Sequence, residues 1–491
     1  MKKIIKNTDN LYIPVMLILL CIAGVFYVVN YPRRQLLIVC AVMSLIAFCA
    51  LYCIKRGYNK ENVIILSLLT LSGIVKADYV IYTPCYVRQH DVIGFGAGFG
   101  QAAFIEYFYE KIRLIDFDPR TLWGFFQPPL HHMISGLWLR LMDFVCPNFG
   151  WACDNVQLLT LVYSLLIPFV SLAIFKKIGL HNKSLMIAML FVCAHPTFIL
   201  LSGSINNDIL CILLQLLAMY YFICWNSEID KDAERKGILS KELVYIILSA
   251  LFLGLSMMTK LSGILIAPAM GIVMLMRLKN KNLVKIITEY FLFAVISIPI
   301  GIWSPVRNLI LFGVPLNFTP EVGEPLTGNS LLARIIDIRT RTPFTNLIDS
   351  GSSYDEFNFF LGMLKTSLFG EYTFADIPFA TAIGWVLLLS GALLAIFILV
   401  AAIKMIFNED VDLYLRVFVS TYSLATMIFY VNLCFSIPNF SSLDFRYIAH
   451  LVLLGGIYLG FYVNRTITRV LLIFSLASVS LYLLIGIVSW R

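Results

Sequence analysis

Long apolar runs recur along almost the whole chain. A membrane-spanning helix needs about 20 apolar residues. Hydrophobic residues make up 60% of the chain and charged residues only 13%, which leaves too few polar side chains to cover a water-soluble protein. The sequence therefore predicts an all-α polytopic membrane protein with about thirteen transmembrane helices, near residues 11–30, 35–54, 62–83, 156–175, 184–201, 209–225, 243–258, 261–278, 284–303, 377–403, 413–435, 447–464 and 467–489.

Basic residues indicate how these helices are oriented. The net charge is +8, and basic residues gather in the connections that follow even-numbered runs, as Lys176 and Lys177 do. Cytoplasmic loops are enriched in Lys and Arg. We therefore expect a cytoplasmic N-terminus in the plasma (inner) membrane. The positive charge then implies a membrane-lipid environment and no nucleic-acid partner.

Two long segments, 84–155 and 304–376, do not span the membrane, and both fall on the outer face. We expect residues 1–491 to form one integral-membrane domain, with 84–155 as an outer catalytic loop and 304–376 as a second outer loop and candidate lid. In the first loop, the run 102–114 and a second run that ends near Phe144 have the apolar periodicity of amphipathic helices. Such helices lie in the membrane interface.

A polar sequence opens the first outer loop. The residues Arg88–Asp91 follow the third apolar run directly and precede a glycine-rich stretch. A loop aspartate is most often simply solvated. Close to an apolar surface, however, a carboxylate can act as a general base that takes a proton from a hydroxyl group. Asp91 is therefore the candidate base, and Glu106 is a second acid in the same loop.

The other outer connections supply two cations and another acid. Asn207-Asp208 stands where the sixth run begins, and either residue is a helix N-cap or a site residue. Lys260 interrupts a continuous apolar stretch, where it snorkels to the surface or meets an anion. Arg446 precedes the twelfth run, where it pairs with Asp444 or clamps a phosphate.

Acids and cations thus converge on one membrane face beside apolar helices. A substrate with a lipid tail, a phosphate and a hydroxyl-rich head group would use all of these groups. The tail would lie in the bilayer, the cations would hold the phosphate, and the acid would activate an acceptor. The chain carries no P-loop, nucleophile elbow or zinc-protease motif.

In this combination the chain resembles the GT-C superfamily of polytopic glycosyltransferases, near the branch of the protein O-mannosyltransferases and aminoarabinose transferases. That branch uses polyprenyl-phosphate sugars as donors. Two positions depart from the pattern, since many relatives carry Asp-Glu in place of His90-Asp91 and Gly-His in place of Gly100-Gln101. The resemblance rests on His90-Asp91, the two amphipathic helices, Gln127-Pro128-Pro129-Leu130-His131-His132, Asn207-Asp208, Lys260-Leu261-Ser262-Gly263, Arg307-Asn308, Lys365–Glu371 and Arg446-Tyr447.

The resemblance implies an inverting transfer of a sugar from a polyprenyl-phosphate donor to a glycan, lipid or protein acceptor. Asp91 matches the position of the family's catalytic base, with His90 and Glu106 as further catalytic candidates. The cations implied to hold the donor phosphate are Lys260, Arg307 and Arg446. The residues implied to bind substrate are Arg88, Gln101, Gln127, His131, His132, Asn207 and Asp208.

We predict no metal site. A divalent cation would need ligands from His90, Glu106, His131 and His132. Adjacent histidines on one helix point to different faces, so this pair would rarely share one ion.

Three other functions fit a similar outline. A polymerase or ligase of lipid-linked glycans performs a neighbouring chemistry, and the sequence does not separate it from a monosaccharide transferase. A lipid or sugar flippase or transporter would place ionisable residues in the middle of the membrane. The predicted helix interiors carry few of these, which favours chemistry at the interface. A non-enzymatic scaffold would not require Asp91, Lys260 and Arg446 to converge.

Overall fold

The computed structural model describes most of the chain after the second predicted span. All regular secondary structure in this part is helical. The predicted span at 11–30, nearly all of that at 35–54, and His90 and Asp91 lie outside the described residues. The described residues are 51–53, 55–89, 92–229, 240–279, 283–316, 318, 331–345, 358–437 and 440–488.

Eight helices of the described part are long and apolar enough to cross a membrane. Each matches a predicted run. They are α3 (Lys60–Tyr82), α6 (Phe149–Lys177), α9 (Asp208–Glu228), α10 (Lys241–Thr259), α12 (Leu283–Phe312), α15 (Ala380–Phe407), α16 (Leu413–Ser436) and α18 (Arg465–Val488).

The remaining predicted runs are broken or short. A bend of 40° separates α7 (Asn182–Ala194) from α8 (Pro196–Gly203), because Pro196 has no N–H to continue the helical hydrogen bonds. A bend of 56° precedes α17 (Leu451–Phe461). The run predicted at 261–278 forms a 3₁₀ turn, η2 (Leu261–Ile266), followed by α11 (Ala267–Arg277). The described part therefore holds eight spans, or up to ten if each bent pair crosses once, so the expected count of thirteen is not confirmed.

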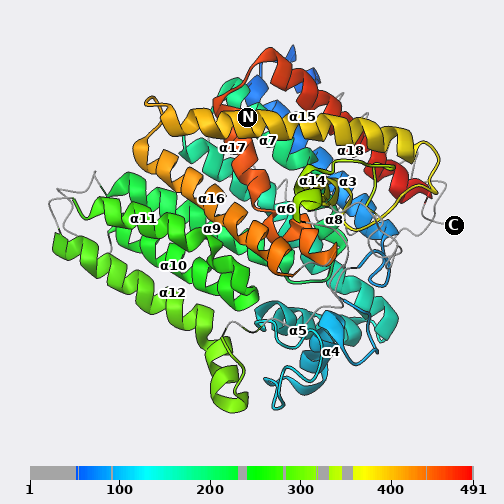
Figure 1. The fold of residues 1–491 in the computed structure, drawn as a ribbon. Helices are drawn as coiled ribbons and strands as arrows, with labels where there is room; N and C mark the ends of the chain where they lie inside the picture. The colour runs from blue at the N-terminus through cyan, green and yellow to red at the C-terminus, as the bar shows by residue number, and fades with distance from the viewer. Residues whose placement is uncertain are drawn as a thin grey trace.

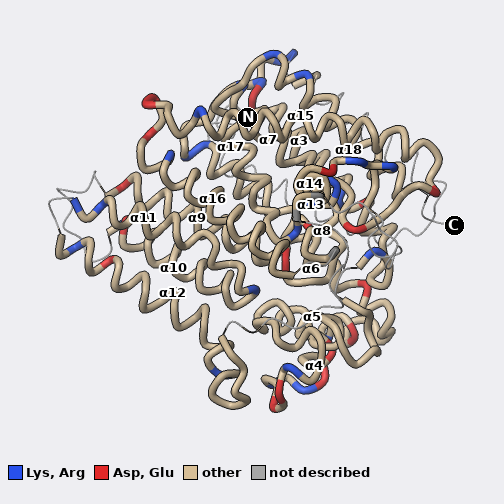
Figure 2. The backbone as a smooth tube through the Cα atoms, viewed as in Figure 1, with Lys and Arg blue, Asp and Glu red and all other residues tan. Residues whose placement is uncertain are grey.

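The long helices pack side by side around an apolar core. In Figure 1, α10 lies between α9 and α12, and it contacts both. On the other side of the bundle, α18 packs on α15 and α3. Figure 2 shows that charged residues gather at helix ends and around α4, while the middles of α10 and α15 carry none. This distribution is expected of helices surrounded by lipid.

Some charged side chains are nevertheless buried within predicted spans. Lys76 and Asp78 are buried in α3, and Glu289 is buried in α12. The Lys76 ammonium donates to the Ser164 carbonyl at 2.8 Å, and the Trp225 indole N–H donates to Glu289 at 2.8 Å. The interiors are thus less free of ionisable groups than the sequence suggested, and two of these three groups tie neighbouring helices together.

The two amphipathic helices of the first outer loop are present. They are α4 (Gly100–Lys111) and α5 (Leu130–Val145), and Figure 1 shows them together at one end of the bundle. Helix α6 begins at Phe149 and α12 ends at Phe312, so both outer segments are shorter than 84–155 and 304–376. The second also contains α13 (Leu331–Ile336) and α14 (Phe359–Phe369).

Helices α4 and α5 pack closely together at Gly136. A Cβ atom there would lie 2.6 Å from the Phe108 Cβ and 2.8 Å from the Ile105 carbonyl oxygen. Because backbone cannot yield at this distance, we expect Gly136→Ala to destabilise the protein by about 1–3 kcal/mol.

A matched helical glycine provides the control for Gly136→Ala. A Cβ atom at Gly271, in α11, would meet no other atom within 4 Å. Gly271→Ala should therefore leave stability unchanged or raise it by up to about 1 kcal/mol through helix propensity. Thermal unfolding of both variants in detergent micelles measures the difference. Equal midpoints would contradict the close packing of α4 on α5.

Candidate active site

A buried carboxylate meets two cations where three distant segments of the chain converge. Asp208 is the first residue of α9 and its side chain is 2% exposed. It forms an ion pair with the Lys260 ammonium, and its second oxygen lies 3.5 Å from Arg446 Nη1. Lys260 stands between α10 and η2, and Arg446 lies in η5 (Phe445–Ile448).

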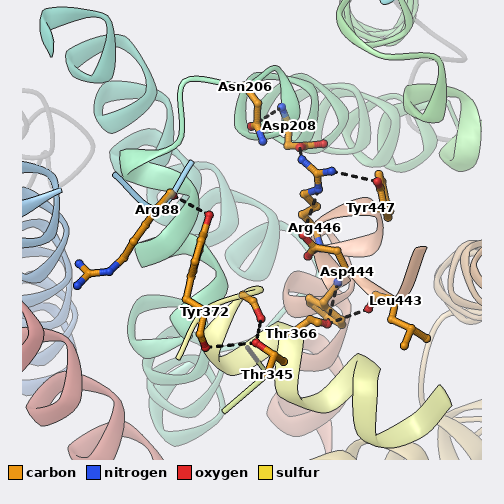
Figure 3. A network of polar contacts seen from close by, with 12 residues as sticks. Arg88, Asn206, Asp208, Thr345, Thr366, Tyr372, Leu443, Asp444, Arg446 and Tyr447 are labelled. Carbon is orange, nitrogen blue, oxygen red and sulfur yellow. Dashed lines mark hydrogen bonds and ion pairs between the residues drawn. The ribbon is translucent and has the colours of Figure 1, made fainter. Parts of the chain in front are cut away.

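Arg446 makes further contacts that fix its guanidinium group. Its Nε lies 3.1 Å from the Asp444 carboxylate, and its Nη2 donates to the Tyr447 hydroxyl at 3.0 Å. The Tyr447 ring also faces Lys260, with the ammonium 4.7 Å from the ring centre. We call Asp208, Lys260, Asp444, Arg446 and Tyr447 the charged cluster; Figure 3 shows four of them, all but Lys260.

The cluster shows which contacts these residues make within the chain. Lys260 does not snorkel to the surface, since its side chain is 13% exposed and is paired with Asp208. Arg446 makes both the local pair with Asp444 and the long-range contact to Asp208. The Asn207 side chain makes no capping hydrogen bond to α9. Two cations and two carboxylates thus balance each other, away from water.

Several predicted substrate-binding residues contact the loop between α8 and α9. The Asn207 backbone N–H donates to Gln101 Oε1 at 3.3 Å, and the Asn207 side-chain amide donates to Gln127 Oε1 at 3.3 Å. His131 Nε2 lies 2.9 Å from the Ile205 carbonyl. Gln89, which the sequence did not single out as a site residue, accepts from the Ile205 N–H at 3.0 Å. These contacts from the first outer loop position Asp208.

Three predicted residues make their contacts away from the charged cluster. Arg307 Nη2 donates to the Ile115 carbonyl at 2.5 Å. Glu106 accepts from the Gly96 N–H at 2.8 Å in the glycine-rich stretch, and burial raises the pKa of this carboxyl group. The His132 ring stacks on Phe104, with ring centres 4.5 Å apart.

Two neighbouring cavities connect the cluster with the outer loops. A cavity of about 30 Å³, which is water-sized, is lined by Arg446, Asp444 and Asn206. A larger cavity of about 360 Å³ is lined by Cys85, Tyr86, Arg88, Gln89, Ile93, Gly94, Glu371, Tyr372 and Thr373. Arg88, Glu371 and Tyr372 line both cavities.

The larger cavity is bordered by the residues on either side of His90-Asp91. Tyr372 contacts the same segment, since its hydroxyl donates to the Arg88 carbonyl at 2.6 Å (Figure 3). Glu371 and Tyr372 lie beyond α14, and no local pattern in the sequence distinguished Tyr372. In the described part of the chain, no three His, Cys, Asp or Glu side chains gather to hold a metal ion.

Comparison with known proteins shows a similarity to one family over part of the chain. Residues 149–323 match the family model of the dolichyl-phosphate-mannose-protein mannosyltransferases. The chain therefore resembles the GT-C glycosyltransferases, as its sequence predicts. The matched segment runs from the start of α6 to beyond α12 and contains Asp208 and Lys260. A comparison with curated protein sequences gives no match.

Solved structures of two membrane glycosyltransferases align with the chain. The oligosaccharyltransferase of Archaeoglobus fulgidus in its apo form aligns with a TM-score of 0.50 and 12% identity, over 87% of this chain and 56% of that one. ArnT from Cupriavidus metallidurans in the apo state aligns with a TM-score of 0.48 and 14% identity, over 82% and 60%. The chain thus spans less than two thirds of the length of these proteins, and its likeness to the oligosaccharyltransferase is one of fold alone.

The charged cluster generates a prediction about stability. Asp208→Asn leaves two buried cations short of a counter-charge, which should destabilise the protein by about 3–5 kcal/mol. Adding Lys260→Gln removes one of those cations, so the double variant should recover about 0.5–3 kcal/mol. Unfolding in detergent micelles measures Asp208→Asn, Lys260→Gln and the double variant. The control is Asp118→Asn, which removes an exposed ion pair with Arg120. Strictly additive losses would mean that Asp208 and Lys260 do not interact.

Burial of His131 generates a prediction about pH. Burial lowers the pKa of His131 to about 4, below the value of about 6.5 for an unfolded chain. Between these values the unfolded state binds a proton that the folded state does not, so stability falls as the pH drops. The expected loss from pH 7 to pH 5 is about 2 kcal/mol.

The variant His131→Gln tests this pH dependence. In this variant the unfolding midpoint should fall less between pH 7 and pH 5 than it does in the wild type. His181→Gln, at an exposed histidine, serves as the control and should keep the wild-type pH dependence. An unchanged slope in His131→Gln would show that His131 does not cause the acid sensitivity.

Proposed function

We propose that the chain is an inverting glycosyltransferase that moves a sugar from a polyprenyl-phosphate monosaccharide donor to an acceptor on the outer membrane face. The observation that carries the proposal is the buried charged cluster, which presents Lys260 and Arg446 at the ends of apolar helices. Asp208 and Lys260 lie in the segment that matches the mannosyltransferase model. The name of that family describes the transfer of mannose from dolichyl phosphate, a polyprenyl-type carrier, to a protein acceptor.

Lys260 and Arg446 are the proposed ligands of the donor phosphate. A guanidinium group suits phosphate oxygens because its N–H groups form a planar fork. In the charged cluster, Asp208 and Asp444 neutralise these cations and keep them in place. An incoming phosphate would take over part of that role while the lipid tail stays among the helices. Arg307, the third predicted cation, contacts Ile115 and is assigned no phosphate contact in this scheme.

Asp91 is the proposed general base. The acceptor oxygen attacks the anomeric carbon from the side opposite the phosphate and forms a new C–O bond, while Asp91 takes the acceptor's proton. The bond from the anomeric carbon to the phosphate oxygen breaks, and polyprenyl phosphate leaves with the bonding electrons. Cations at the departing phosphate stabilise its developing charge.

The neighbourhood of Asp91 supports this assignment. The residues that flank it, Arg88 and Gln89 on one side and Ile93 and Gly94 on the other, line the cavity of about 360 Å³. This volume falls within the range of small-molecule sites. Arg88 also lines the small cavity that reaches Arg446, so the acceptor and the donor phosphate would approach from adjoining spaces. His90 and Glu106 remain the further catalytic candidates.

The proposal is tested by transfer of a radiolabelled hexose from a panel of polyprenyl-phosphate donors into membrane lipids, glycans and proteins. Asp91→Asn should reduce transfer by at least about 100-fold, because it removes the proton acceptor. Asp116→Asn is the control, since this acid lies in the same loop and pairs with Arg113 at the surface.

Each result has a defined meaning. Transfer by the wild type and by Asp116→Asn, but not by Asp91→Asn, supports both the transferase and its base. Full turnover by Asp91→Asn removes Asp91 from the mechanism. If folded wild-type protein transfers no monosaccharide, transfer from a glycan-pyrophosphate donor would indicate a polymerase or ligase. Failure of every donor would favour a flippase or a scaffold.

A further inference from the structure

A third cavity, of about 370 Å³, lies at the far end of α9 from the charged cluster. Asp208 begins α9, whereas Asn226 and Ser227, near its last residues, line this cavity. At 1.5 Å per residue, Asn226 lies roughly 27 Å along the helix from Asp208. The cavity is therefore on the opposite membrane face and is separate from the candidate active site.

The ends of four helices form this cavity. Lys177 is the last residue of α6, Arg277 is the last residue of α11, and Asp412 immediately precedes α16. Deeper in, the lining is apolar and aromatic, with Phe222 and Phe418 among its residues. A charged rim above an apolar floor matches a molecule with a polar head and a hydrocarbon body, as a membrane lipid has.

Of the two cations on the rim, Arg277 is fixed by its contacts. The Arg277 residue is 4% exposed, and its Nε and Nη2 donate to the Asn226 side chain and carbonyl, each at 2.9 Å. The Tyr414 ring covers the guanidinium group at 3.7 Å. The Lys177 side chain is 27% exposed and lies 3.9 Å from the Glu228 carboxylate, so it can still turn toward a ligand. Such cations near the cytoplasmic membrane face suit lipid phosphates.

The rim also carries a negative charge. Asp412 is exposed, and one of its oxygens accepts from the Leu415 N–H at 2.9 Å, which caps α16. A purely anionic head group would meet this carboxylate unfavourably. A head group with both a phosphate and a primary ammonium satisfies both sides of the rim, since the ammonium can donate hydrogen bonds to Asp412.

We propose that this cavity binds the head group of an amino-phospholipid of the phosphatidylethanolamine type. The phosphate lies against Lys177 and Arg277, the ammonium lies against Asp412, and the acyl chains extend over the apolar floor into the bilayer. The assignment is independent of the proposed transferase activity.

Native mass spectrometry of the full-length protein in detergent tests the proposal. Equimolar phosphatidylethanolamine, phosphatidylglycerol and phosphatidylcholine with identical acyl chains compete for binding. The wild type should retain phosphatidylethanolamine preferentially. Lys177→Gln should weaken its binding by about tenfold, through loss of one charge-assisted contact. Lys176→Gln, one residue away and outside the cavity lining, should behave as the wild type.

A second variant tests the carboxylate without disturbing the helix. Asp412→Asn keeps a capping side chain at the start of α16 but removes the charge. It should abolish the preference for phosphatidylethanolamine over phosphatidylglycerol. Because Asp412 is exposed, this variant stays informative even if Lys177→Gln does not fold.

The outcomes that overturn the proposal are distinct. Equal retention of the three lipids by the wild type would exclude a head-group site. Preferential binding of phosphatidylglycerol would exclude a role for Asp412. Equal losses in Lys177→Gln and Lys176→Gln would indicate a general charge effect. Complete displacement of the lipid by inorganic phosphate would identify a site for a free ion.

Discussion

A charge removed from water among apolar helices needs an opposite charge beside it, and Asp208 meets this need for two cations at once. Lys260 and Arg446 come from segments almost two hundred residues apart, and their shared carboxylate holds the ends of α9 and α10 and the short η5 helix at one point. A buried pair of this kind adds little net stability compared with an apolar core. Its value here is that it specifies where the helix ends meet, and hence where an anionic substrate would find cations.

The transmembrane helices were predictable because lipid forces each spanning segment to satisfy its own backbone hydrogen bonds. Every predicted run in the described part is helical. What hydropathy could not predict is where a run breaks. The bend at Pro196 follows from the missing N–H of that proline, and the short helix that ends at Arg277 begins only after the 3₁₀ turn Leu261–Ile266; average apolarity records neither feature.

The candidate site was predictable in part, for a similar reason. Asp208, Lys260 and Arg446 stood out because charge is rare beside apolar runs, and topology placed them on one face. Gln101, Gln127 and His131 contact the segment between α8 and α9, which the sequence did not predict because a polar side chain in a sequence does not reveal its partner. Gln89 and Tyr372 were not singled out, since their contacts join residues more than a hundred positions apart.

Contacts between the first outer loop and the segment between α8 and α9 also limit how far either sequence can change without the other. Side chains from three parts of that loop contact Ile205 and Asn207, directly before the acid that organises the cations. A chimera that exchanged the outer loop alone would separate these partners and displace Asp208. The loop and the short α8–α9 segment therefore form one module, and a chimera would have to exchange both together.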